Sequence, residues 1–213
     1  MKDEVMQELH ELGIIPVVVL DNAEDAEALS DALVKGGLPC AEVTFRTDAA
    51  AETIRRMAKR HPDMLVGAGT VLSPEKVVEA KEAGARFIFS PGLNPSVVKK
   101  AQELGLTVIP GTQTPTEMEM AMGLGLDVVK FFPAELSGGI KMLKAVSAPY
   151  VNLKFMPTGG LNAENVKDYL AWDRILACGG SWIAKNDLVK EGRFDEIEAR
   201  AREAREIVKE IRG

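Results

Sequence analysis

Short runs rich in β-branched residues alternate with helical patterns along the entire chain. Eight of these runs are expected to form strands, at residues 14–20, 40–45, 64–70, 86–92, 107–112, 127–132, 152–158 and 174–180. Each run is too short to be a helix, and several carry the continuous apolar pattern of a strand that is buried on both faces. Regular alternation of this kind predicts βα units joined into one parallel sheet.

The segments between the runs contain the signals that start and stop helices. Ser73-Pro74 and Asn94-Pro95 place a capping side chain directly before a proline, which favours a helix start, and Asn162 is a further candidate. Gly36 and Gly84 follow helical patterns, where glycine favours a helix end. Eight strands, each followed by a helix, predict a single small (β/α)8 barrel over residues 1–213, with an extra N-terminal helix. A doubly wound open sheet is the alternative.

Composition excludes several classes of partner. Of the 213 residues, 46% are hydrophobic, which is enough to build one substantial core. The formal net charge is −6, and no segment supplies the basic face that nucleic-acid or membrane-surface binding would need. The apolar run from Ile14 to Leu20 is too short to cross a bilayer. We therefore expect a cytoplasmic protein with neither a nucleic-acid nor a membrane partner.

The cysteine and histidine content argues against a disulfide framework and a metal site. Cys40 and Cys178 are far apart in the chain, and each lies beside apolar residues, as buried free thiols do. His10 and His61 lie in polar stretches without acids or cysteines at ligand spacing. We expect no metal and no cofactor.

Charged residues inside two of the predicted strands need an explanation. Lys130 lies in the apolar run DVVKFF, while Glu42 and Arg46 share one face of the second run because side chains alternate along a strand. A structural ion pair, or a lysine whose stem packs and whose amine reaches water, would account for these residues without any chemistry. Lys154 also lies in a strand, but it is further from the strand's carboxyl end.

Other polar and glycine residues lie where the strands end, which is the end at which barrels of this type carry their active sites. Two diglycine turns, Gly159-Gly160 and Gly179-Gly180, follow the last two strands. Glycines let backbone N–H groups converge on an anion, and a helix opened by Asn162 would add its positive end. A phosphate site is one interpretation of these turns, and tight packing is the other.

Together these residues suit one kind of chemistry. A lysine held among apolar groups is more available as a neutral, nucleophilic amine. A carboxylate to move protons, an arginine to bind a carboxylate and a phosphate cradle complete the set. The combination suits an enzyme that forms an imine with a phosphorylated keto acid, in which the protonated imine serves as the electron sink.

Six motifs in order make the chain resemble the bifunctional 2-keto-3-deoxy-6-phosphogluconate (KDPG) / 4-hydroxy-2-oxoglutarate (KHG) aldolases. The motifs are EVTFRT (42–47), VGAGTVL (66–72), SPGLN (90–94), KFFPAE (130–135), PTGG (157–160) and GGSW (179–182). This resemblance implies a metal-independent class I aldolase, which is a carbon–carbon lyase. It also implies a small barrel that assembles into a homotrimer.

The resemblance also assigns roles to individual residues. It implies that Lys130 forms the Schiff base, that Glu42 is the general acid/base and that Arg46 binds a substrate carboxylate. Substrate-binding roles fall on Thr70, Pro91, Phe132 and Thr158, and phosphate-binding roles on Gly159, Gly160, Gly180 and Ser181.

The implied reaction is reversible cleavage of KDPG to pyruvate and glyceraldehyde 3-phosphate, with cleavage of KHG to pyruvate and glyoxylate as a related activity. Two alternatives remain open: specificity for the galactonate epimer of KDPG, and a phosphosugar-binding barrel without catalysis. The chain departs from some members after its first strand, where it carries Asp21 instead of a basic residue. This departure bears on how a dianionic substrate is held.

Overall fold

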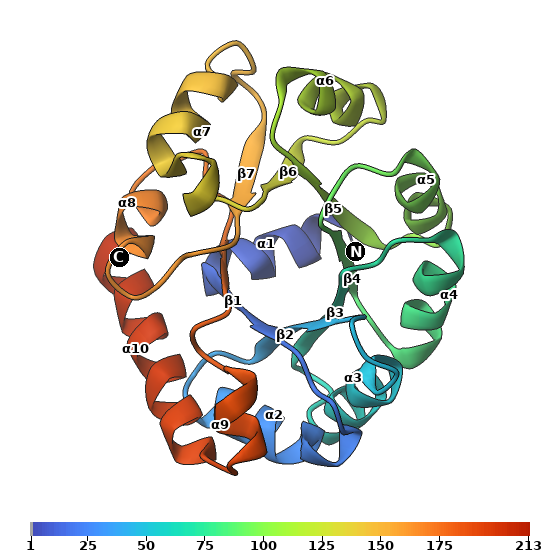
Figure 1. Ribbon diagram of the computed structural model, residues 1–213, viewed down its shortest axis with the longest axis vertical. Helices are drawn as coiled ribbons and strands as arrows, with labels where there is room; N and C mark the ends of the chain where they lie inside the picture. Colours follow the sequence, from blue (N-terminus) through green and yellow to red (C-terminus); the bar gives the residue numbers. More distant parts are fainter. Residues whose placement is uncertain (1) are drawn as a thin grey trace.

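Eight parallel strands form the inner layer of a barrel and helices form the outer layer, in a computed structural model that describes residues 2–213, with side chains from residue 4 onward (Figure 1). The strands are β1 (Ile14–Val18), β2 (Cys40–Thr44), β3 (Leu65–Gly69), β4 (Phe87–Ser90), β5 (Thr107–Thr112), β6 (Val128–Phe131), β7 (Lys154–Pro157) and β8 (Cys178–Gly180). They pair in the order β7-β6-β5-β4-β3-β2-β1-β8. Isolated parallel bridges, Phe155 with Ile175 and Thr158 with Gly179, join β7 to β8. The predicted barrel is confirmed, and the open doubly wound sheet is wrong.

Helices follow the strands around the ring. They are α1 (Lys2–Leu12), α2 (Ala26–Lys35), α3 (Ala50–Arg60), α4 (Pro74–Ala83), α5 (Pro95–Glu103), α6 (Pro115–Gly123), α7 (Gly139–Ser147), α8 (Val166–Leu170), α9 (Asn186–Lys190) and α10 (Phe194–Arg212), with 3₁₀ helices η1 (Ala23–Asp25) and η2 (Glu135–Ser137). Ser73 and Asn94 cap α4 and α5 as predicted, because each side chain accepts a hydrogen bond from a backbone N–H of the first turn. Gly84 ends α4 in the left-handed conformation.

Asn162 opens a single turn, in which its carbonyl accepts a hydrogen bond of 3.1 Å from Val166 N–H, and the predicted helix begins only after this turn. The Asn162 side chain accepts hydrogen bonds from the backbone N–H groups of Glu164 and Asn165, at 2.9 and 3.0 Å, and so forms a turn. The α-helix begins only at Val166 and is five residues long. The N–H groups of Glu164 and Asn165 are therefore occupied by this asparagine side chain and are not free donors for an anion.

Helix α1 crosses one end of the barrel, which confirms the predicted N-terminal helix (Figure 1). Its apolar face buries Val5 and Leu9 against the core. Arg86, just before β4, donates a hydrogen bond of 2.8 Å to Glu8 of α1, so the helix covers the end where the strands begin. The carboxyl ends of the strands lie at the opposite end, which α1 leaves uncovered.

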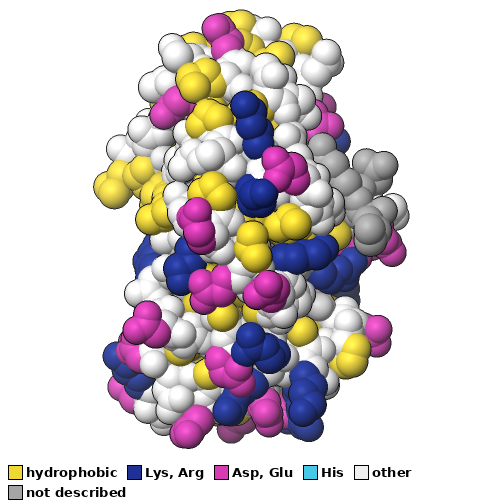
Figure 2. Space-filling view, turned by 90° about the vertical axis from the view of Figure 1, so that its right-hand side faces the viewer, with side chains coloured by type: hydrophobic (Ala, Val, Ile, Leu, Met, Phe, Trp, Pro, Cys, Tyr) yellow, Lys and Arg dark blue, Asp and Glu magenta, His cyan; other side chains and the backbone are white. Residues whose placement is uncertain are grey.

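The strands are buried on both faces, which is why their sequences are apolar throughout. Cys40 and Cys178 are both buried and free, as predicted. Burial raises the pKa of both thiols. No helix in the described chain combines the length and the apolar character needed to cross a bilayer. On the face over α4 and α5, acidic and basic side chains are interspersed rather than separated by sign (Figure 2).

Candidate active site

Lys130 and Glu42 form a buried ion pair inside the barrel. Lys130 Nζ lies 3.0 Å from Glu42 Oε1 and 3.3 Å from Oε2. Lys130 is 5% exposed and Glu42 is 1% exposed, so both charges are almost fully removed from water. Removing charges from water is costly, and the pair offsets this cost by mutual neutralisation and hydrogen bonding. The two residues come from β6 and β2, on opposite parts of the ring, and only barrel closure brings them together.

Glycine creates the space that Glu42 occupies. A Cβ added to Gly69 of β3 would lie 2.2 Å from Glu42 Oε1, far inside van der Waals contact. Gly111 of β5 pairs in register with Lys130, and a Cβ there would lie 2.0 Å from the Pro91 carbonyl oxygen. These glycines let the Glu42 carboxylate pack against β3 and the Pro91 carbonyl pack against β5 next to Lys130 in register.

Aromatic rings surround the Lys130 amine. Its Nζ lies 5.7 Å from the ring centroid of Phe89 and 5.7 Å from that of Phe132. Phe89 stacks on Phe87 within β4, with centroids 4.3 Å apart. The ring faces carry partial negative charge and stabilise a cation at this position, whether an ammonium or an iminium.

Lys154 has a different position, which confirms the contrast predicted between the two lysines. It is the first residue of β7, it is exposed, and it pairs in register with Val128 at the start of β6. Lys154 therefore lies at the end of the barrel where the strands begin. Lys130 lies two residues further along β6, inside the barrel.

A cavity of about 310 Å³ opens at the carboxyl ends of β1, β2, β7 and β8. Its lining includes five of the residues singled out from the sequence: Arg46, Phe132, Thr158, Gly159 and Ser181. The rest of the lining comprises Val17, Val19, Ala184, Lys185 and Asn186. Phe132 connects this cavity to the buried pair, because the same side chain lines the cavity and lies beside the Lys130 amine.

Thr158 presents an unused polar group next to the cavity. Its side chain is 5% exposed, and its Oγ1 has no hydrogen-bond partner among the described residues. A Cβ on Gly179 would lie 2.4 Å from this hydroxyl, so the glycine is what lets Thr158 fit here. A buried hydroxyl without a partner is costly, and a ligand oxygen would remove that cost.

The remaining predicted residues lie around the cavity without lining it. Gly160 is exposed, and a Cβ there would meet the Glu135 side chain. Gly180 is buried, and a Cβ there would meet Ile14 at 2.9 Å. Thr70 and Pro91 are half-buried at the ends of β3 and β4. Thr70 adopts φ +56°, a left-handed conformation that is strained for a β-branched residue.

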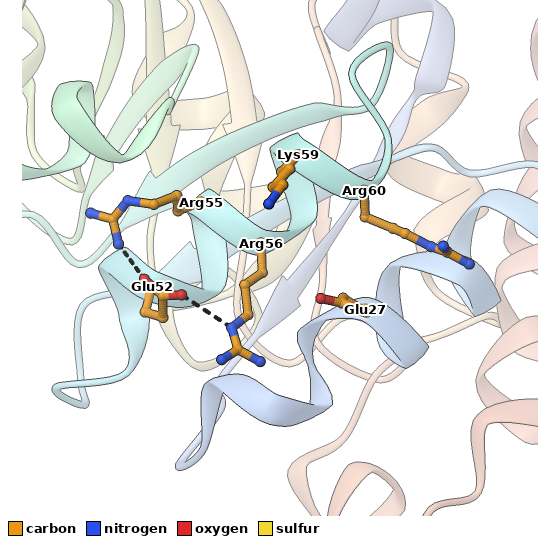
Figure 3. A pocket seen from close by; sticks show the side chains of 6 residues that line it. All are labelled: Glu27, Glu52, Arg55, Arg56, Lys59 and Arg60. Carbon is orange, nitrogen blue, oxygen red and sulfur yellow. Dashed lines mark hydrogen bonds and ion pairs between the residues drawn. The ribbon is translucent and has the colours of Figure 1, made fainter.

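A larger space of about 640 Å³ lies away from the strand ends, between α2 and α3 (Figure 3). It is lined by charged residues only: Glu27, Glu52, Arg55, Arg56, Lys59 and Arg60. Glu52 is paired with both Arg55 and Arg56, and Arg60 forms two hydrogen bonds of 2.9 Å with Asp31. These are solvated surface pairs, and they make no contact with the Lys130 site.

Among the side chains that the structure describes, no cluster of three or more histidine, cysteine, aspartate or glutamate residues could hold a metal ion. The polar groups at the strand ends are a lysine–carboxylate pair, one arginine and several hydroxyls. This set can form a covalent bond to a carbonyl carbon and move protons beside it.

The family comparison agrees with this geometry. The sequence model of the family described as "KDPG and KHG aldolase" matches residues 5–200. The chain belongs to this family. A 2-dehydro-3-deoxy-phosphogluconate aldolase of Haemophilus influenzae is 48% identical over 206 residues, which cover 97% of each chain. A KHG/KDPG aldolase of Escherichia coli is 44% identical over 196 residues, covering 92% of each.

A solved structure shares the fold closely. The KDPG aldolase of Legionella pneumophila, captured with pyruvate as a covalent carbinolamine intermediate, superimposes with a TM-score of 0.89 at 36% identity. The match covers 93% of this chain and 96% of the Legionella chain. The resemblance recognised from the six motifs is thus confirmed.

Sequence reasoning missed two features of this KDPG/KHG aldolase family member. Lys185 and Asn186 line the cavity but lie in a polar segment after β8, where a solvated loop is the ordinary expectation. Glu135, the last residue of the KFFPAE motif, accepts a hydrogen bond from Tyr169 of α8. Burial and this carboxylate raise the pKa of Tyr169 far above its usual value. A buried tyrosine in a polar helix was the one available signal.

Proposed function

We propose that this protein is a metal-independent class I aldolase that reversibly cleaves KDPG to pyruvate and glyceraldehyde 3-phosphate. The observation that carries the proposal is the buried contact of 3.0 Å between Lys130 Nζ and Glu42 Oε1 beside an open cavity. The relatives named as KDPG aldolases, and the carbinolamine captured in the Legionella enzyme, support the same chemistry.

The first half of the reaction forms the imine. The ammonium proton of Lys130 passes to Glu42, and the neutral amine attacks the C2 carbonyl of KDPG to give a carbinolamine. Glu42 returns this proton to the carbinolamine hydroxyl, which leaves as water, and a protonated imine remains on Lys130. The rings of Phe89 and Phe132 stabilise the positive charge of this imine.

The second half breaks the carbon–carbon bond. Glu42, now a carboxylate, takes the proton of the C4 hydroxyl as the C3–C4 bond breaks, and glyceraldehyde 3-phosphate leaves. The electron pair of that bond enters the iminium and gives an enamine. Glu42 then protonates C3, and water hydrolyses the resulting iminium to pyruvate and the free Lys130 amine. Each proton is moved by the same carboxylate, which is why its close contact with the amine matters.

The surrounding residues hold the substrate. Arg46 binds the C1 carboxylate, for which its planar guanidinium is suited. The Thr158 hydroxyl donates to a substrate oxygen, and Phe132, Thr70 and Pro91 shape the pocket around the reacting carbons. Phosphate binding is proposed for Gly159, Gly160, Gly180 and Ser181. Gly159 and Ser181 line the cavity directly, and the other two glycines permit the close turns beside them.

The Escherichia coli relative is named for both KHG and KDPG, which supports cleavage of KHG to pyruvate and glyoxylate as a second activity. Preference between KDPG and its galactonate epimer depends on placement of the C4 hydroxyl to within about an ångström. Relative kcat/KM values for the three substrates rank these possibilities. Activity that is abolished by EDTA and restored by a divalent ion would contradict the metal-independent mechanism.

The test of the proposal is reduction with borohydride in the presence of pyruvate. The expected result is a stable adduct on the peptide that contains Lys130. Lys130→Met, which keeps the length of the side chain and removes the amine, should abolish both the adduct and KDPG cleavage. Lys154→Met is the matched control, because Lys154 is exposed at the other end of the barrel, and it should retain both.

A barrel that only binds phosphosugars would give a different pattern. It would form no adduct at Lys130, and Glu42→Gln would leave the turnover of any residual activity unchanged. For an aldolase, Glu42→Gln should reduce kcat by about 100- to 10,000-fold, the usual contribution of a general acid/base.

We also propose that the protein is cytoplasmic and forms a homotrimer, as its family resemblance implies. Sedimentation velocity of the purified chain measures the assembly directly, and a monomer at micromolar concentration would contradict the trimer.

A further inference from the structure

The segment after β8 carries a lysine to the rim of the cavity. Ile183 and Ala184 are buried, and so are Leu188 and Val189 of α9, so the segment is anchored to the barrel on both sides of Lys185. Lys185 itself has extended backbone, is exposed and lines the cavity. The buried residues on both sides therefore fix the backbone of Lys185 at the rim of the cavity.

The acidic residue at this rim is already paired. Asp21, just beyond β1, lies 2.7 Å from Lys190 Nζ and accepts a hydrogen bond of 3.4 Å from Asn186. The hydrogen bonds from Lys190 and Asn186 lower the pKa of the Asp21 carboxyl. Lys190 thus neutralises the acid at this rim, and Lys185, which lines the cavity, forms no ion pair with that acid.

Two cations line the cavity without a carboxylate partner. In the part of the chain with described side chains, neither Arg46 nor Lys185 forms an ion pair, whereas Lys190 on the same segment as Lys185 pairs with Asp21. In a protein with a net charge of −6, two unpaired cations at one cavity indicate an anionic ligand with more than one negative group. The two proposed anionic groups of KDPG are its C1 carboxylate and its C6 phosphate.

The chemistry of the two cations assigns one anion to each. Arginine offers a planar fork that matches a carboxylate, whereas lysine is a compact point charge suited to a phosphate. Arg46 follows the strand that carries Glu42, at the reacting end of the site. Lys185 follows Ser181 and shares the cavity wall with Gly159, at the proposed phosphate end.

We propose that Lys185 binds the phosphate of the substrate and sets the preference of this enzyme for phosphorylated over unphosphorylated keto acids. The proposal rests on the aldolase function proposed above and adds a specificity residue to it. The segment after β8 thus supplies a second positive charge at the cavity, in addition to that of Arg46.

The test compares Lys185→Gln with Lys154→Gln on two substrates, KDPG and 2-keto-3-deoxygluconate, which has the same carbon skeleton without the phosphate. Loss of a charged hydrogen bond to phosphate should lower kcat/KM for KDPG by about 10- to 100-fold in Lys185→Gln, mainly through KM. The value for 2-keto-3-deoxygluconate should stay within about twofold. Lys185→Arg should restore most of the loss.

Lys154→Gln is the control, because Lys154 is an exposed lysine at the opposite end of the barrel and does not line the cavity. It should leave both substrates unchanged. Equal loss on both substrates in Lys185→Gln, no loss on KDPG, or the same loss in Lys154→Gln would each overturn the proposal.

Borohydride trapping with pyruvate tests the aldolase function separately from the role of Lys185. Pyruvate carries no phosphate, so the wild type and Lys185→Gln should trap it equally at Lys130. If both trap pyruvate and the substrate preference is unchanged, only the role of Lys185 is refuted. If the wild type traps no pyruvate, the aldolase function itself fails, and the assignment of Lys185 fails with it.

Discussion

Gly69→Ala tests whether the spacing of the buried pair controls turnover. The new Cβ would lie 2.2 Å from Glu42 Oε1, and an ordinary contact needs at least 3.4 Å, so the carboxylate must move by 3.4 − 2.2 = 1.2 Å. The backbone of Gly69 is not in the left-handed region, and the three atoms nearest to an added Cβ all belong to Glu42. The displacement would break the 3.0 Å contact of Glu42 Oε1 with Lys130.

A displacement of about an ångström in a catalytic group costs about 100-fold in rate. Overpacking should also cost about 1–3 kcal/mol of stability, which for a chain of this size lowers Tm by about 2–12 °C. The assay is KDPG cleavage, followed by reduction of the pyruvate product with lactate dehydrogenase and NADH. Circular dichroism measures the thermal transition of the same samples.

Gly92→Ala is the matched control. Gly92 lies in the loop beside Pro91, it has no left-handed backbone, and no atom lies within 4 Å of an added Cβ. This variant should keep its turnover and its Tm. The reasoning is refuted if Gly69→Ala folds and retains the kcat of the wild type, because Glu42 would then work from a position that the structure does not allow.

Three further changes test other parts of the molecule. Thr70→Gly should be more stable than Thr70→Ala by about 1 kcal/mol in urea unfolding, because only glycine accepts φ +56° without strain, and the reverse order would contradict this. Asp31→Asn should cost about 1–2 kcal/mol at pH 7, after allowance for partial exposure, because Arg60 lowers the pKa of Asp31 to about 2. This stabilisation is complete above the ordinary value of 3.8, so the difference between variant and wild type should vanish as the pH falls toward 2, and a constant difference would refute the pairing. Arg174→Met should cost about 2–3 kcal/mol in the same unfolding assay, because its guanidinium donates to the backbone carbonyls of Ser147, Tyr150 and Leu153, and an unchanged urea midpoint would show that water replaces those bonds.

The barrel could be predicted because apolar strand runs and helical segments alternate regularly along the sequence. Each buried strand needs an apolar run and each outer helix needs caps, so the eight units can be counted. The exact residues at which strands begin and end are harder to predict. The run 174–180 contributes only Cys178–Gly180 to β8, while Ile175 at its start meets Phe155 of β7 in an isolated bridge. Asn162 looked like a helix cap because its turn uses the same side-chain hydrogen bonds as a cap does.

The sequence identifies Lys130 and Glu42 as separate candidates, but it does not show that their side chains are in contact. Lys130 and Glu42 are 88 positions apart, and only strand order and register bring them to 3.0 Å. Lys185 could not be selected in advance, because a lysine in a polar loop is ordinary until its neighbours are placed. The strain at Thr70 was hidden for a similar reason. A β-branched residue after a strand gives no sign of a left-handed backbone.

Neighbouring strands of the barrel are not joined equally strongly around its circumference. β6 and β7 share a continuous ladder of four residue pairs, whereas the described parts of β7 and β8 meet through two isolated bridges, one of them between Thr158 and Gly179. Local opening costs less where fewer backbone hydrogen bonds must break. Amide exchange should therefore be faster at this seam than along the β6–β7 ladder. Lys130, which would form the covalent bond, lies in β6, where exchange should be slow. Gly159 and Gly180, which are proposed to bind the phosphate, lie beside the bridge between Thr158 and Gly179, where exchange should be fast. Local opening at the β7–β8 seam would then release the phosphate of the product, while the carbons bound to Lys130 stay in place.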